Sequence, residues 1–191
     1  MRKMLVTLFV MSSLLVFSQS LDSKNFNSST LNSLLLKEIN SFRKERGLDT
    51  LIFSKTMYDS LSYPNCKEVA NKCDFYHPDV TTKWKRGTIK KMIAKESNKL
   101  LNDTIVTYDN GIPWITYYEN AFRATLSNYT SYSELVAVAI DSWEKSPEHQ
   151  KTQNTVFESK GLPSFFSCHS EYAKNGYVYI YINFTLVHRE R

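Results

Sequence analysis

The sequence predicts a single α+β domain in which helices are layered against a sheet. Four segments place apolar residues at helical spacing, whereas the segment 177–187 alternates with the period of a strand. The chain has 191 residues, of which 42% are hydrophobic, so it is long enough for one buried core and too short for two ordinary domains. We therefore expect one layered domain without an internal linker.

The strand expected over 177–187 is apolar on both faces. One face carries Val178, Ile180, Ile182, Phe184 and Leu186, and the other carries Tyr177, Tyr179, Tyr181 and Val187. A strand with two apolar faces belongs in a sheet that is covered on both sides. Its expected partner strands are 114–121 and 161–168.

The first two helices are expected near the start of the domain. A cap at Ser29 or Thr30 begins the first helix, and Gly47 ends it. The second begins at Ser54 and is expected to be interrupted by Pro64, because proline has no N–H to donate.

Two further helices are expected in the middle of the chain. The segment 87–101 spaces Ile89, Met92 and Ile93 helically, together with Leu100. The segment 131–143 begins at a cap supplied by Ser131 or Ser133.

The first twenty residues have the pattern of an export signal. Arg2 and Lys3 precede an apolar run at 4–17, and Ser18 and Ser20 fit the positions before a cleavage site. The run is too short to span a bilayer comfortably, so a permanent anchor is the weaker interpretation. We expect a secreted or periplasmic protein without a transmembrane anchor after cleavage. It would consist of a flexible arm at 21–29 and a single domain at 30–188.

The charge of the chain excludes one class of function and leaves another open. The net charge of +5 is too mild to indicate a dedicated nucleic-acid binder. One basic cluster nevertheless lacks acidic residues: Lys83, Lys85, Arg86, Lys90, Lys91 and Lys95. It is either a solvated helix face or a contact for anionic lipid head groups or cell-envelope polymers.

Three cysteines, Cys66, Cys73 and Cys168, would be exported into a compartment where disulfides persist. One bridge is therefore expected, and one thiol is left over. A Cys66–Cys73 bond requires the chain to turn between them, because seven residues of helix rise about 10.5 Å. Cys66–Cys168 is the competing pair.

Three polar residues stand in a recognisable order along the chain. His77 follows the second helical region, Glu119 precedes an asparagine, and His149 ends the string Trp143-x-x-Ser-Pro-x-His. With a first helix that closes at Gly-Leu and an alternating C-terminal strand, this order resembles the CAP superfamily. That family contains cysteine-rich secretory proteins, venom allergens and pathogenesis-related proteins, and the Trp-x-x-Ser-Pro string is similar to its bacterial members.

The resemblance covers nearly all of the chain after the signal and implies a fold and a site. The implied fold is a three-layer α-β-α sandwich with a central, mostly antiparallel sheet. The implied site is a cleft in which His77 and His149 match the family's two histidines and Glu119 matches its glutamate. Glu144 is the nearest counterpart of a second family carboxylate, although it directly follows the tryptophan.

The sequence also departs from the family pattern. Tyr118 stands where a glycine usually precedes the glutamate, and Glu148 replaces the glycine before His149. The segment 79–112, with its basic helix, is longer than in compact members and is expected to be an insertion beside the cleft.

Two imidazoles that converge on a cleft suit a borderline divalent ion such as Zn²⁺. With His77 and His149 as the only protein ligands, water would complete the coordination shell and the ion would bind weakly.

Three candidate functions follow from these residues. The first is an exported ligand-binding or envelope- and host-interaction module with a metal cleft. The second is a peptidase-like hydrolase in which Glu119 acts as the base, with Glu144 as a further candidate. The third is a structural domain whose polar cleft has no function.

Overall fold

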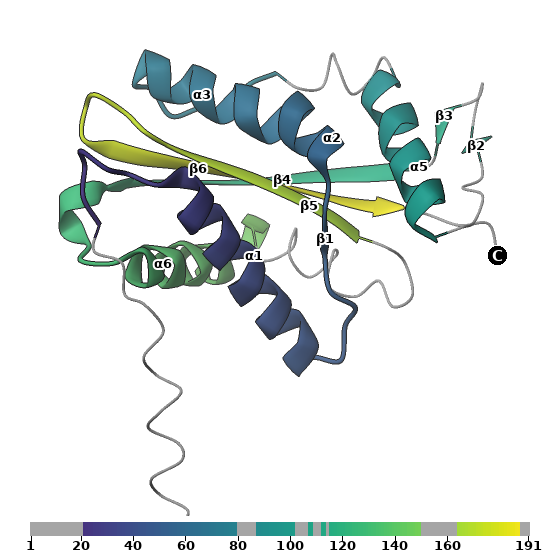
Figure 1. Cartoon of the computed structure of the whole chain (residues 1–191), viewed down its shortest axis with the longest axis horizontal. Coiled ribbons are helices and arrows are strands. Elements are labelled where there is room, and N and C mark those ends of the chain that lie inside the picture. The colour runs from purple at the N-terminus through teal and green to yellow at the C-terminus, as the bar shows by residue number, and fades with distance from the viewer. Residues whose placement is uncertain are drawn as a thin grey trace, which may run out of the picture.

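The computed structural model describes residues 21–79, 87–101, 107–108, 112–113, 115–149 and 164–187. Helices cover both faces of one central sheet, which confirms the predicted α+β class (Figure 1). Helices α1 (Ser28–Glu45) and α6 (Tyr132–Lys145) form one outer layer. Helices α2 (Lys55–Met57), α3 (Tyr63–Lys72) and α5 (Thr88–Leu101) form the other.

The central sheet has four strands in the order β1-β5-β6-β4. Strand β6 (Tyr177–Val187) pairs antiparallel with both β4 (Ile115–Thr125) and β5 (Ser164–Tyr172). The short β1 (Ile52–Phe53) is parallel to β5, so the sheet is mostly antiparallel. A separate small ladder pairs β2 (Thr107–Tyr108) with β3 (Ile112–Pro113).

Strand β6 is buried on both faces, as its alternation predicts. Its even-numbered residues from Val178 to Leu186 pack in one core cluster with α1 and α6. Tyr179 and Tyr181 pack on the opposite face, against Cys66 and Val69 of α3. The faces of β6 therefore determine which helices lie in which layer.

Helix α1 begins earlier than its expected caps. Asn27 is the N-cap, and its side-chain oxygen accepts from the backbone N–H of Thr30 at 3.0 Å. At the other end Gly47 has a φ of 66°, and the N–H of Leu48 reaches the carbonyl of Arg43 at 3.0 Å. This is the Schellman termination that a glycine favours, so the predicted end is confirmed.

The segment expected to be a flexible arm is held against the domain. Leu21 donates its backbone N–H to the carbonyl of Thr130 at 3.2 Å, and Phe26 packs against the core. The backbone N–H of Asn27 donates to the hydroxyl of Tyr132 at 2.6 Å. These contacts place 21–27 beside α6.

Pro64 does not interrupt the second helical region. A π-helical turn, η1 (Tyr58–Ser62), joins α2 to α3, and Pro64 lies in the first turn of α3. The first turn tolerates proline because its N–H groups have no partner within the helix. The wider π turn shifts the backbone hydrogen-bond register just before Pro64.

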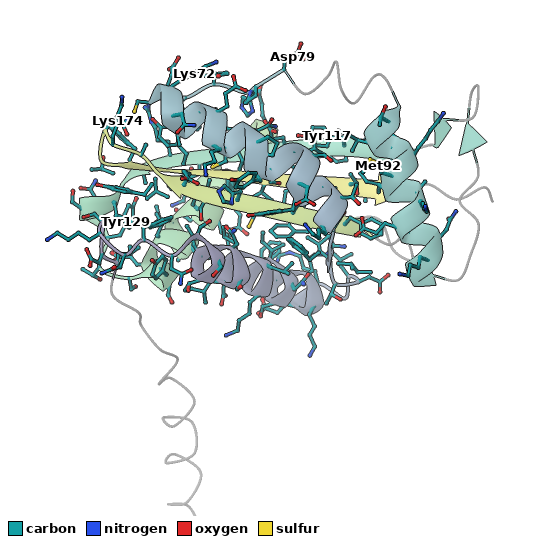
Figure 2. All side chains as sticks on the ribbon, turned by 45° about the horizontal axis from the view of Figure 1, so that its top comes forward. Lys72, Asp79, Met92, Tyr117, Tyr129 and Lys174 are labelled. Atoms are coloured by element: carbon teal, nitrogen blue, oxygen red, sulfur yellow. The ribbon has the colours of Figure 1, made fainter. Side chains whose placement is uncertain are left out.

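Helix α5 has the predicted extent, but Met92 does not lie on its buried face. Ile89 and Ile93 are buried, whereas Met92 is 46% exposed (Figure 2). Lys91 and Lys95 are also exposed. Lys90 of the same basic cluster is half-buried, and its other members, Lys83, Lys85 and Arg86, lie outside the described residues.

The expected disulfide is not formed. All three cysteines lie in the described part of the chain and are free thiols. Cys66 and Cys73 are on one uninterrupted helix and its C-cap, so the turn that their bond requires is missing. Cys66 and Cys168 belong to core clusters on opposite faces of the sheet, which excludes the second pairing in this fold.

Within the described ranges, no helix is long and apolar enough to cross a membrane.

Candidate functional site

His77 and Glu119 meet on the face of the sheet that α3 covers. His77 follows α3, and the chain before it is held where the hydroxyl of Tyr181 donates to the carbonyl of Tyr76. Glu119 lies on β4, paired with Asn183 of β6. Nδ1 of His77 is 2.7 Å from Oε1 of Glu119. The side chain of His77 is 58% exposed and that of Glu119 only 9% exposed, so the imidazole faces solvent while the carboxylate lies beneath it.

The second oxygen of Glu119 is fixed from the core side. The hydroxyl of Tyr117 donates to Oε2 at 2.8 Å, and the amide of Asn183 donates to the same oxygen at 3.1 Å. Asn183 is fully buried, and its own oxygen accepts from the hydroxyl of Ser62 at 2.6 Å. The carboxylate is therefore held at both oxygens, and Tyr117 lies on the sheet toward α5 (Figure 2).

His149 belongs to the opposite layer of the sheet. It lies just beyond α6, whose last turn is anchored by Trp143. Trp143 is fully buried, and its indole N–H donates to the backbone carbonyl of Ala121 on β4 at 3.0 Å. Because β4 is the outer strand of the sheet, this bond places the end of α6 beside the strand that carries Glu119.

The pKa values of the two histidines reflect their surroundings. The hydrogen bond to Glu119 raises the pKa of His77, against the opposing effect of burial. Burial lowers the pKa of His149, and repulsion from a protonated His77 lowers it further.

Glu144 lies elsewhere. It lines a groove between α1 and α6 together with Glu38 and Glu45, on the opposite side of the sheet from the His77–Glu119 bond. Its position directly after the buried Trp143 turns it away from β4. The structure therefore brings His77 and Glu119 together, places the end of α6 that precedes His149 beside β4, and leaves Glu144 out.

The hydrogen bonds at this site suit Glu119 as a carboxylate that orients His77 rather than as a metal ligand itself. Because Glu119 accepts at Nδ1 of His77, that nitrogen carries the proton and Nε2 is free to bind an ion. Among the residues that the structure describes, no three His, Cys, Asp or Glu side chains are grouped so that they could together hold a metal ion. A divalent ion here would have the two imidazoles and water as ligands.

Tyr117, Asn183 and Ser62 form the support of the site and were not expected from the sequence. One signal was available: Asn183 falls on the tyrosine-bearing face of a strand that is apolar on both sides. A buried amide in such a strand needs partners, which predicts a polar network on that face. The sequence contained no comparable indication for Ser62, because the direction of its side chain depends on the π turn.

We expect the substitution Glu119→Gln to lower the pKa of His77, since the bond to the carboxylate is the main cause of its rise. A ¹H–¹⁵N titration of the histidine rings measures this directly. In the native protein the raised pKa stabilises the fold fully below about pH 6.5, and this stabilisation is lost as the pH rises through the pKa of folded His77. The contribution is small because the ring is exposed. An unchanged pKa in the variant would show that Glu119 does not control this histidine.

No protein-family model matches the chain, and no curated protein matches it. Among solved structures, it is similar to an outer surface protein from Borrelia burgdorferi. The two chains are 12% identical over 90% of this chain and 100% of the other, with a TM-score of 0.43. At this level of similarity the comparison assigns neither a family nor a function.

Proposed function

We propose that the chain is an exported, CAP-like interaction module whose cleft binds a divalent cation such as Zn²⁺ weakly through His77 and His149. The observation that supports this best is the bond from Nδ1 of His77 to Glu119. A carboxylate in that position fixes the tautomer and directs Nε2 outward, as second-sphere carboxylates do for metal-bound histidines. With only two imidazole ligands, the ion exchanges readily with solvent.

Calorimetric titration with Zn²⁺ tests the proposal. We expect His77→Ala and His149→Ala each to abolish measurable binding, and Glu119→Gln to weaken it roughly 10–100-fold. Glu144→Gln is the matched control, because that carboxylate lines the α1–α6 groove and should leave the affinity unchanged. Binding should strengthen as the pH rises through the pKa of His77, since the ligand must be deprotonated. Zinc affinity that survives both histidine substitutions would refute the site.

A role as a hydrolase is the alternative, and the surroundings of Glu119 make it less favourable. Both of its oxygens already accept hydrogen bonds, from His77, Tyr117 and Asn183. A general base needs a free oxygen directed at the attacking water. The arrangement therefore favours Glu119 as an orienting group.

The exposed face of α5 supports a contact with an anionic partner, either lipid head groups or an envelope polymer. Lys91, Met92 and Lys95 are exposed there, which combines positive charge with an apolar side chain. We expect co-sedimentation with vesicles that contain anionic lipid to fall when Lys91→Glu and Lys95→Glu are combined, and to fall in high salt. Binding that is indifferent to both changes would exclude this partner.

A further inference from the structure

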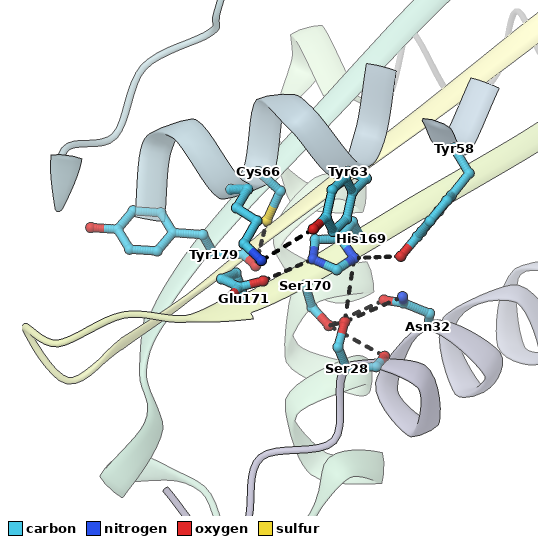
Figure 3. Close-up of polar contacts among 10 residues, drawn as sticks. Ser28, Asn32, Tyr58, Tyr63, Cys66, His169, Ser170, Glu171 and Tyr179 are labelled. Atoms are coloured by element: carbon cyan, nitrogen blue, oxygen red, sulfur yellow. Dashed lines mark hydrogen bonds and ion pairs between the residues drawn. The ribbon is translucent and has the colours of Figure 1, made fainter. Parts of the chain in front are cut away.

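A second polar cluster lies at the other edge of the sheet, around His169 of β5. In the described part of the chain, β1 pairs with Phe165 and Phe166 at the start of β5, and the later part of β5 is bordered by helices. The start of α1 and the π turn η1 supply the neighbours of His169, which is 5% exposed (Figure 3). This cluster is separate from the His77 site on β4.

His169 links a carboxylate to two hydroxyl groups. Its Nε2 is 2.9 Å from Oε2 of Glu171, and its Nδ1 is 3.1 Å from the hydroxyl of Tyr58 and 3.5 Å from Oγ of Ser28 (Figure 3). Because a carboxylate only accepts, we assign the ring proton to Nε2, which leaves Nδ1 as an acceptor. The order carboxylate, imidazole, hydroxyl is that of a nucleophile with an oriented base.

Ser28 occupies a position that suits a nucleophile. It is the first residue of α1, where backbone N–H groups have no partner within the helix and favour negative charge. Its Oγ is also held by Ser170 Oγ at 3.2 Å and by the amide of Asn32 at 3.4 Å. The side chain is partly exposed, so a substrate can reach it.

A cavity of about 360 Å³ adjoins this cluster. Asn32, which contacts Ser28, and Tyr58, which contacts His169, both line it. The rest of the wall is mainly apolar and comprises Leu36, Phe53, Phe166 and Cys168 with two serines. Its size is in the range of small-molecule sites, and its wall suits a short acyl chain.

We propose that Ser28, His169 and Glu171 form a second site that hydrolyses esters of short acyl chains bound in this cavity. Ser28 Oγ attacks the ester carbonyl carbon while its proton passes to Nδ1 of His169. The backbone N–H groups of Ser28 and Ser29 are the donors for the resulting oxyanion, because the N–H of Thr30 already donates to Asn27. His169 then returns the proton to the leaving alcohol oxygen as the ester C–O bond breaks.

Water completes the cycle. It attacks the acyl-Ser28 carbonyl and loses a proton to Nδ1, which is then returned to Ser28 Oγ as the carboxylic acid leaves. Glu171 keeps the imidazole in the required tautomer and stabilises its charged form. Burial lowers the pKa of His169, which keeps the resting ring neutral and able to accept the proton.

Tyr58 competes with Ser28 for the same nitrogen, because its hydroxyl is the closer partner of Nδ1. Removing that hydroxyl leaves the imidazole to Ser28. Tyr58→Phe should therefore raise the rate of acylation, an effect that a purely structural cluster would not produce.

The test is hydrolysis of p-nitrophenyl butyrate by the full-length protein, with mass spectrometry of the chain after reaction with a fluorophosphonate. We expect the probe on Ser28, a loss of about 100-fold or more in Ser28→Ala and His169→Gln, and a gain of a few-fold in Tyr58→Phe. Ser41→Ala is the matched control, because Ser41 is an exposed serine on the same helix outside the cavity, and it should keep the native rate. Circular dichroism checks that each variant is folded. No hydrolysis above buffer by the native protein, an unchanged rate in Ser28→Ala, or labelling at another serine would overturn the proposal.

Discussion

Trp143→Ala is expected to lower the free energy of unfolding by about 3–5 kcal/mol, the largest effect of any single substitution considered. The ring is fully buried between α6 and the sheet, in edge-on contact with Phe122 at a centroid distance of 6.3 Å. Its loss leaves a cavity and removes the donor to the Ala121 carbonyl. For a domain of this size, the melting temperature should fall by about 10 °C.

Two companion variants separate the causes. Trp143→Phe keeps most of the volume but loses the N–H, so it should cost clearly less than the alanine variant. Val138→Ala is the control on the same helix, because Val138 is 38% exposed and its truncation should change stability by no more than about 0.5 kcal/mol. Equal effects of Trp143→Ala and Val138→Ala in chemical denaturation would contradict the role given to the indole.

Asn183→Leu is expected to cost about 2–4 kcal/mol, although leucine has a similar volume. The substitution removes the donor to Glu119 and the acceptor for Ser62 from a fully buried position. Buried polar groups that lose their partners pay the desolvation cost without compensation. Denaturation by urea measures the loss.

The same variant should also alter the site. Without Asn183, Glu119 is held only by Tyr117 and His77, so we expect the pKa of His77 to fall and zinc affinity to weaken. Asn71→Leu is the control, since Asn71 is exposed on α3 and should affect neither stability nor the histidine. If Asn183→Leu lowered stability but left the pKa of His77 unchanged, the buried hydrogen bonds of Asn183 would not support the histidine site.

Much of the layering could be predicted from local patterns. The alternation of 177–187 predicted a strand covered on both sides, and the helical spacing at 131–143 predicted α6. Of the two serines expected to cap that helix, Ser131 is the N-cap. These features depend on residues close in sequence. The start of α1 at Asn27 was harder to predict, because the N–H of Asn27 is held by Tyr132, 105 residues away.

The π turn before Pro64 shows a second limit. Proline alone predicted a break, but packing of Met57 and Leu61 against α5 and β5 keeps the helical path continuous. Such packing cannot be read from local spacing. The expected disulfide failed for a similar reason, because the sheet separates Cys66 from Cys168.

The histidine site was predicted in part. The family resemblance implied a cleft that contains His77 and Glu119, and these two side chains are in contact, whereas the support of Glu119 by Tyr117 and Asn183 depends on strand register. The His169 cluster was missed altogether. Its signal was the placement of Glu171 two residues after His169 in a strand, which puts both side chains on one face.

The most direct test of the central claim is a zinc titration followed through the ring nitrogens of the histidines by ¹H–¹⁵N correlation spectra. Above the pKa of His77, we predict a proton on its Nδ1 and a zinc-induced shift at its Nε2. The ring of His149 should shift at the same zinc concentration, and the other two histidines should not. A proton on Nε2 of His77, or a shift at only one of the two rings, would contradict a shared cation site.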